Sequence, residues 1–154
     1  MKSMIWAGVL SFFIILFNYF NSRRLDNLKI YPQIRAKSWS FCLLLLSTLT
    51  WIIYLFSYEF LFRGFLLFSS ERAFGIWIAV AINVILYAAA HIPKGMRESL
   101  AAVPFGIILC LLTLWTQTIW IAFISHSVLA LSNELFSLSA HSDMKFSIRK
   151  EFER

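Results

Sequence analysis

Long apolar runs separated by short polar stretches dominate the chain. Five such runs lie at about residues 4–20, 39–69, 74–91, 99–116 and 119–137. At about 1.5 Å of rise per residue, each is long enough to cross the roughly 30 Å hydrocarbon core of a bilayer as an α-helix. The pattern therefore predicts an all-α protein, a polytopic transmembrane helical bundle of about five spans.

The second run is too long for one straight crossing. A helix over residues 39–69 must tilt, kink or project beyond the hydrocarbon core. Gly64, directly after Arg63, is where we expect such a helix to bend.

No internal repeat or linker divides the chain into independent domains. We instead distinguish three segments. Residues 1–38 form an N-terminal transmembrane helix and a basic cytoplasmic loop, residues 39–137 a four-helix membrane core, and residues 138–154 a basic cytoplasmic tail.

Composition agrees with a membrane environment. Of the 154 residues, 60% are hydrophobic and 14% are charged, whereas soluble domains have about 45–50% apolar and about 25% charged residues. The net charge of +6 does not indicate nucleic-acid binding, because the basic residues are not interleaved with aromatic ones. We expect the lipid bilayer, and no nucleic acid, among the partners.

The basic residues set the expected orientation. If there are five spans, eleven of the fourteen Lys and Arg residues lie on one side, namely Arg23, Arg24, Lys29, Arg35, Lys37, Lys94, Arg97, Lys145, Arg149, Lys150 and Arg154. The opposite side holds only Lys2 and Arg72. By the positive-inside rule, the chain is a multi-pass protein of the cell membrane with its N-terminus outside and its C-terminus in the cytoplasm.

Ionisable side chains interrupt the apolar runs, among them Glu59, Arg63, His91 and His126. A charged side chain at the bilayer centre costs on the order of 2.5–3.5 kcal/mol, so such residues need partners or a function. Glu59 and Arg63 stand at i and i+4, where they can neutralise each other, and a purely structural ion pair explains these two residues equally well. Asn133 follows His126 by seven residues and lies on the same helical face.

Together, a carboxylate and two imidazoles from three different runs suit a hydrolytic site. Glutamate and histidine activate water and transfer protons, and histidine or asparagine can donate to a developing oxyanion. The chain lacks a His-Glu-x-x-His motif, so the zinc chemistry of that peptidase class has no support in the sequence.

The order of these residues resembles the CPBP family of intramembrane proteases, which includes CAAX-processing and bacteriocin-processing enzymes and is also called the Abi family. The resemblance covers about residues 45–137. Its three motifs, Glu-Glu-x-x-x-Arg, Phe-x-x-x-His and His-x-x-x-Asn, have counterparts in Tyr58-Glu59-Phe-Leu-Phe-Arg63, Tyr87-Ala-Ala-Ala-His91 and His126-Ser-Val-Leu-Ala130.

Two positions depart from the family pattern. Tyr58 replaces the first glutamate, to which the family's mechanism assigns water activation, and Ala130 replaces the asparagine. The chain is either a variant branch, in which Glu59 takes the base role and Asn133 or Glu98 fills the gaps, or a catalytically inactive membrane protein acting as a scaffold or immunity factor. We favour the variant branch because the four ionisable residues persist at a cost in insertion energy.

Glu98 is a candidate because it ends the segment "HIPKGMRE", which resembles a His-Pro-Lys-x-x-x-Glu variant of such branches. An acidic residue that stabilises the first turn of a helix explains Glu98 equally well.

The resemblance implies an intramembrane endopeptidase whose substrate is a membrane-embedded or lipidated protein or peptide. Glu59 and His91 would activate the water, and Arg63 would hold Glu59. His126, with or without Asn133, would stabilise the oxyanion. We expect no cofactor; a zinc-dependent reaction would instead use His91 and His126 as ligands and Glu59 as the base.

This site sets one geometric condition. Counted from the turn near Glu71, His91 lies several residues deeper in the bundle than Glu59. The two side chains can meet only if the helices tilt or if the third span starts after Gly75.

Overall fold

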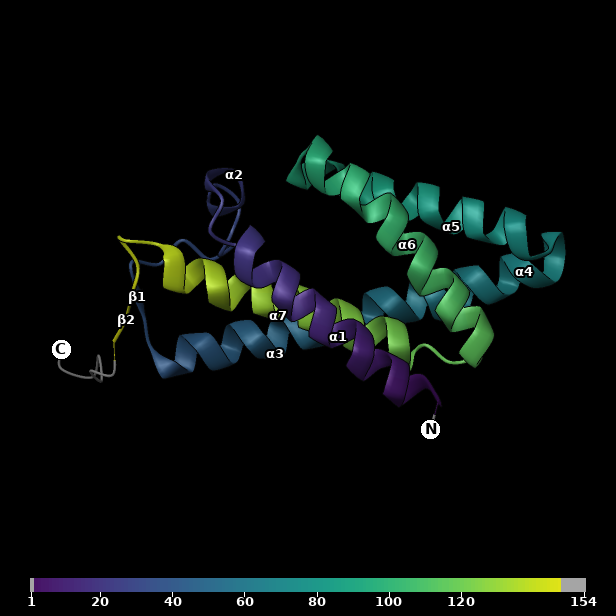
Figure 1. Cartoon of the computed structure of the whole chain (residues 1–154), viewed down its shortest axis with the longest axis horizontal. Coiled ribbons are helices and arrows are strands. Elements are labelled where there is room, and N and C mark those ends of the chain that lie inside the picture. The colour runs from purple at the N-terminus through teal and green to yellow at the C-terminus, as the bar shows by residue number, and fades with distance from the viewer. Residues whose placement is uncertain (1, 148–154) are drawn as a thin grey trace.

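The computed structural model describes residues 2–147, and this part of the chain is built almost entirely of helices (Figure 1). The long helices are α1 (Lys2–Asn21), α3 (Phe41–Glu59), α5 (Ile76–Ala90), α6 (Met96–Thr116) and α7 (Trp120–Ala140). The short elements are α2 (Leu25–Leu28), the π-helical segment η1 (Phe60–Leu67), α4 (Phe68–Phe74) and the 3-10 turn η2 (Ile92–Lys94).

Five helical segments in the described part are long and apolar enough to cross a membrane. They are Ser3–Asn21, Phe41–Phe74, Ile76–Lys94, Met96–Thr116 and Trp120–Ala140. The predicted all-α bundle of five spans is confirmed.

The second span follows one continuous helical path from Phe41 to Phe74. Gly64 lies inside η1, so the irregularity at this position is a widening of the helical turns. The chain reverses direction at Gly75 (Figure 1), whose φ of +80° is a conformation that favours glycine. The third helix therefore begins at Ile76, which meets one of the two alternative conditions that the sequence set for placing His91 and Glu59 at the same depth.

A short parallel strand pair differs from the sequence expectation. Strand β1 (Ser38–Trp39) pairs with strand β2 (Lys145–Phe146) near the end of the described chain. Trp39, which the apolar pattern assigned to the second span, therefore lies before that span. The helix starts at Phe41 because the Ser40 hydroxyl accepts a hydrogen bond from the Leu43 N–H at 3.2 Å and caps its first turn.

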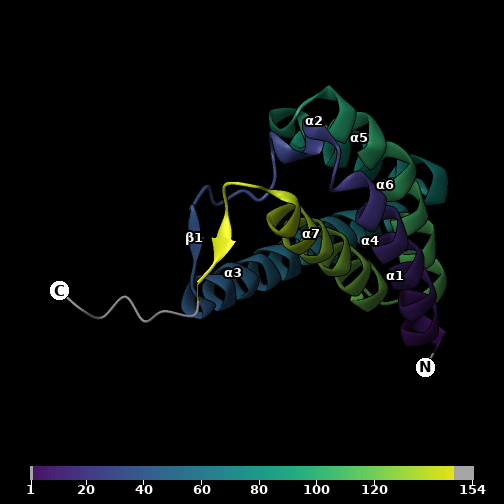
Figure 2. The same cartoon turned by 60° about the vertical axis from the view of Figure 1, so that its left-hand side comes forward.

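Long helices pack side by side, both pairs that are distant in sequence and one consecutive pair. α1 lies along α7, α3 packs against α7, and α5 packs along α6 (Figures 1 and 2). Between α1 and α7, the buried Asn18 side chain donates to the Leu129 carbonyl oxygen and the Ser132 hydroxyl oxygen, both at 2.8 Å. Such polar contacts hold helices together in lipid, where burial of apolar surface contributes little to their association.

Contacts join the three basic segments that were predicted to share one side. Arg97 lies 3.6 Å from Asp26, and the Lys145 N–H donates to the Lys37 carbonyl oxygen at 2.9 Å. These segments therefore lie at the same end of the bundle. The predicted side of the membrane and the three-segment division stay predictions, and the rest of the predicted basic tail, residues 148–154, lies outside the described residues.

Candidate functional site

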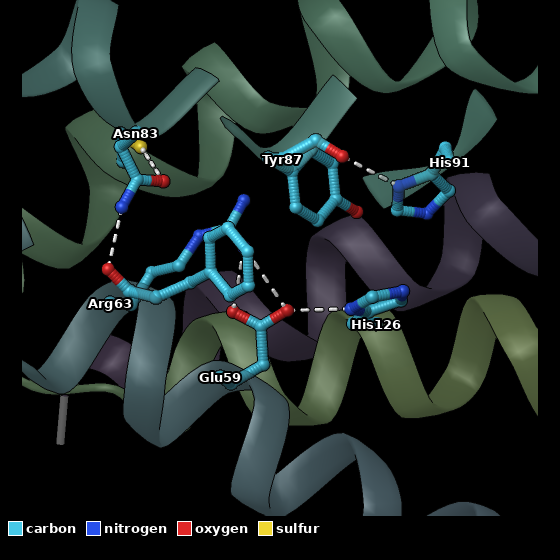
Figure 3. Close-up of polar contacts among 8 residues, drawn as sticks. Glu59, Arg63, Asn83, Tyr87, His91 and His126 are labelled. Atoms are coloured by element: carbon cyan, nitrogen blue, oxygen red, sulfur yellow. Dashed lines mark hydrogen bonds and ion pairs between the residues drawn. The ribbon is translucent and has the colours of Figure 1, made fainter. Parts of the chain in front are cut away.

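Glu59 and Arg63 form the predicted ion pair inside the bundle (Figure 3). Glu59 ends α3, Arg63 lies in η1, and both side chains have no solvent exposure. Arg63 Nη1 lies 3.2 Å from Glu59 Oε2, and the guanidinium carbon lies 4.1 Å from the ring centroid of Tyr87 in α5. A charge this deeply buried is tolerated because its opposite charge and an aromatic face surround it.

Asn83 fixes η1 against α5 and so positions Arg63. The Asn83 side-chain amide donates to the Phe62 carbonyl oxygen at 2.5 Å, and its own oxygen accepts from the Cys110 thiol at 3.2 Å (Figure 3). A side chain from a neighbouring helix thus binds a backbone group of the π-helical turns.

His126, from α7, contacts the same carboxylate. Its Nδ1 atom lies 2.5 Å from Glu59 Oε1. Because an ionised carboxylate can only accept, Nδ1 donates the hydrogen bond and Nε2 is left for another partner. Arg63, Glu59 and His126 therefore form one continuous polar chain across η1, α3 and α7 (Figure 3).

His91 lies at the end of α5, close to His126. Its Nδ1 atom is 2.8 Å from the Tyr87 carbonyl oxygen. Because a carbonyl oxygen only accepts, Nδ1 carries the hydrogen, and Nε2 of the neutral ring is an acceptor. The ring centroids of the two histidines are 6.3 Å apart and their planes differ by 28°, so the two predicted imidazoles come together.

A cavity of about 170 Å³ opens beside these two rings. We call it the histidine cavity; its walls include Tyr58, His91, Lys94, Glu98, His126, Ala130 and Asn133. Glu59 does not line the histidine cavity and contacts one of its walls through His126. Water activation by Glu59 stays a prediction.

The two predicted supporting residues Glu98 and Asn133 both line the histidine cavity. Glu98 stands in the first turn of α6, so its position agrees with a role in the site and with a role at the helix start. It is the only carboxylate among the described residues that line this cavity. The buried Asn133 oxygen Oδ1 has no hydrogen-bond partner in the described part of the chain.

Tyr58 and Lys94 are two of several residues of the histidine cavity to which the sequence gives no site role. The family pattern marks Tyr58 only as the replacement of a glutamate, yet its ring centroid lies 5.8 Å from that of His126 and 6.4 Å from that of His91. Its buried hydroxyl has no hydrogen-bond partner among the described residues. The sequence places Lys94 in a basic segment and in the His-Pro-Lys-x-x-x-Glu variant but gives it no site role. The sequence does contain a signal for both residues, because Tyr58 directly precedes Glu59 and Lys94 follows His91 by three residues.

The donor atoms around the cavity bear on the zinc alternative. Within residues 2–147, no three His, Cys, Asp or Glu side chains gather as a group that could hold a metal. Glu59 and the Nδ1 atom of His126 are bound to each other. Two imidazole nitrogens would leave a zinc ion short of the three protein ligands of catalytic zinc sites.

The comparison with family models gives a match for this chain. The model of the family described as "Type II CAAX prenyl endopeptidase Rce1-like" matches residues 30–132, which is more than half of the chain. This stretch contains the four ionisable residues of the predicted motifs and Glu98, and it ends just before Asn133. Neither the comparison with curated proteins nor the comparison with solved structures found a match.

Proposed function

Because the chain belongs to the Rce1-like family of type II CAAX prenyl endopeptidases, we propose that it is an intramembrane endopeptidase of the CAAX type. Its substrate is a membrane-embedded or lipidated protein or peptide. The observation that carries the proposal is a pair of imidazoles that line one cavity. Nδ1 of His126 donates to Glu59, and Nδ1 of His91 donates to the Tyr87 carbonyl oxygen. Their Nε2 atoms are left for water and substrate.

We assign His91 the role of general base. Its Nδ1–H donates to the Tyr87 carbonyl oxygen, so the neutral ring offers the lone pair of Nε2 to a water molecule. The water attacks the scissile carbonyl carbon while its proton passes to His91. Glu98, the carboxylate of the same cavity, balances the positive charge that His91 gains.

We assign His126 the role of oxyanion donor. In its doubly protonated form, Nε2–H donates to the oxygen of the tetrahedral intermediate, and Glu59 balances the added charge. The Tyr58 hydroxyl and the Asn133 amide line the same cavity and are further donors to that oxygen. The intermediate collapses when the C–N bond breaks and His91 returns the proton to the leaving amine, which gives a new carboxylate and a new amino terminus.

In this mechanism Glu59 acts through His126 and does not contact the water, so it is a positioning residue. Arg63 holds its carboxylate at 3.2 Å from the other side. This differs from the role that the motif resemblance gave to Glu59, because Tyr58, and not Glu59, is the residue of this pair that lines the cavity.

Cleavage of an S-farnesylated CAAX peptide by the purified protein in liposomes tests the proposal. His91→Ala and His126→Ala should each lower kcat/KM by about 10²–10⁴, the range that general acid–base groups contribute. His141→Ala is the matched control, because His141 lies at the end of α7 and is not one of the residues that line the histidine cavity. Normal cleavage by both cavity variants would contradict the site, and no cleavage by the wild-type protein would favour the inactive scaffold.

A further inference from the structure

We propose that Lys94 binds the free C-terminal carboxylate of the substrate and is therefore a specificity-determining residue of the proposed site. The inference rests on the proposed endopeptidase function and adds the feature by which the substrate is recognised.

Lys94 stands where two cavities meet. It lines the histidine cavity together with His91 and His126. It also lines a second cavity of about 270 Å³, which we call the adjacent cavity, whose walls include Gln33, Ile34, Ser47, Thr50 and Glu134. Trp51 and Tyr54 line both cavities as well. A substrate that reaches the two histidines from the adjacent cavity therefore passes the lysine.

Aromatic rings hold the ammonium group without neutralising it. Lys94 Nζ lies 5.2 Å from the Trp51 ring centroid and 5.8 Å from the Tyr31 ring centroid, distances at which an aromatic face attracts a cation. Burial raises the pKa of Tyr31, with smaller contributions from Glu98 and Glu134, so its phenol stays neutral beside the lysine. The two rings confine the ammonium and leave its charge available.

The charge of Lys94 is not used by an ion pair with any described residue. Glu134, on the adjacent cavity, already accepts hydrogen bonds from the Trp51 indole N–H at 3.0 Å and from the Gln33 backbone N–H at 3.1 Å. Glu98 shares the histidine cavity but lies beyond ion-pair distance of Lys94. An incoming carboxylate would thus be the first direct partner of this ammonium.

The spacing suits a short C-terminal segment. Lys94 follows His91 by three residues, and its N–H donates to the His91 carbonyl oxygen at 3.0 Å, which closes a single 3-10 turn. At about 2 Å of rise per residue, the two backbones are roughly 6 Å apart along the turn, and the lysine side chain extends the reach. A CAAX sequence ends with three residues after its cysteine, and three extended residues span about 10 Å. Lys94 can therefore meet the terminal carboxylate while the bond after the cysteine lies at His91.

Two forms of one peptide test this inference, an S-farnesylated CAAX peptide with a free C-terminal carboxylate and the same peptide with a C-terminal amide. Wild-type protein in liposomes should cleave the acid form with a kcat/KM at least about tenfold higher, the effect of one hydrogen bond to a charged group. In Lys94→Met the ratio should fall to about one, and in Lys94→Arg it should stay high. Lys29→Met is the matched control, because Lys29 is exposed and pairs only with Asp26 in the described part.

Equal cleavage of both forms by the wild-type protein would overturn the inference while leaving the proposed function intact. A Lys94→Met variant that keeps the wild-type preference for the acid form would also overturn it. If the wild-type protein cleaves neither form, the proposed function fails, and binding of the same two peptides, measured by fluorescence anisotropy, decides about Lys94 alone. Tighter binding of the acid form, lost in Lys94→Met, would support the inference, and equal binding would overturn it.

Discussion

At the scale of single residues, the neighbouring residues Tyr58 and Glu59 have different surroundings and different proposed roles. Successive residues on a helix point about 100° apart, so neighbouring side chains can face different surroundings. Tyr58 faces the histidine cavity, and Glu59 faces Arg63 and His126 in the protein interior. The tyrosine therefore takes the place where the family motif has its first glutamate, next to both imidazoles.

Tyr58→Phe tests whether this hydroxyl takes part in the reaction. We expect kcat/KM for the farnesylated peptide to fall by about 10²–10³, the usual effect of removing one oxyanion donor. We expect the Tm to change little, because the hydroxyl has no hydrogen-bond partner among the described residues. Tyr54→Phe is the control, since Tyr54 lines the same cavity and the residue is 56% exposed. Equal activity of Tyr58→Phe and the wild-type protein would remove Tyr58 from the mechanism.

The sequence could identify the ionisable residues of the candidate site but not their directions. Glu59, Arg63, His91 and His126 stand out because charges are costly in lipid. Whether Tyr58 or Glu59 faces the cavity depends on packing between helices that are distant in sequence. The local sequence pattern does not contain this information. Tyr58 and Lys94 were left without a role for this reason, although both lie beside residues that the sequence singled out.

At the scale of helices and strands, hydropathy predicted the five spans to within a few residues at most ends. The signal is strong because each span must satisfy all its backbone hydrogen bonds within the lipid. The strand pair joining Ser38–Trp39 to Lys145–Phe146 was not predicted, because two-residue strands over such a separation leave no periodic pattern. The π-helical form of η1 was not predicted either, since it is seen only with its contact from Asn83 to the Phe62 carbonyl oxygen.

Gly75 controls where α5 begins and therefore where His91 lies. Its φ of +80° would strain any residue with a side chain, so Gly75→Ala should lower the free energy of unfolding by about 1–3 kcal/mol. Thermal unfolding in detergent measures this change. Gly64→Ala is the control, because an added methyl group there would meet its nearest neighbours at an ordinary 3.5 Å. A Tm for Gly75→Ala at or above that of Gly64→Ala would show that the reversal tolerates a side chain.

At the scale of the whole molecule, the basic segments gather at one end of the bundle. Contacts between Arg97 and Asp26 and between Lys145 and Lys37 join three segments that the sequence separates. The histidine cavity lies near this end, because Arg97 and Lys94 line it together with His91. The side of the membrane that holds the basic segments is thus the side nearest to the candidate site.

The positive-inside rule predicts that this side is the cytoplasm. Single cysteines in a chain without Cys42 and Cys110 test the prediction in intact cells with a membrane-impermeant thiol reagent. Asp26→Cys and Lys145→Cys should be protected, because both positions lie at the basic end, and Glu71→Cys, at the end of the bundle where α4 turns into α5, should react. Permeabilised cells provide the control, in which the two protected positions should become reactive. Reaction of Asp26→Cys in intact cells would reverse the orientation and make the histidine cavity accessible from outside, so its substrates would then be extracytoplasmic proteins.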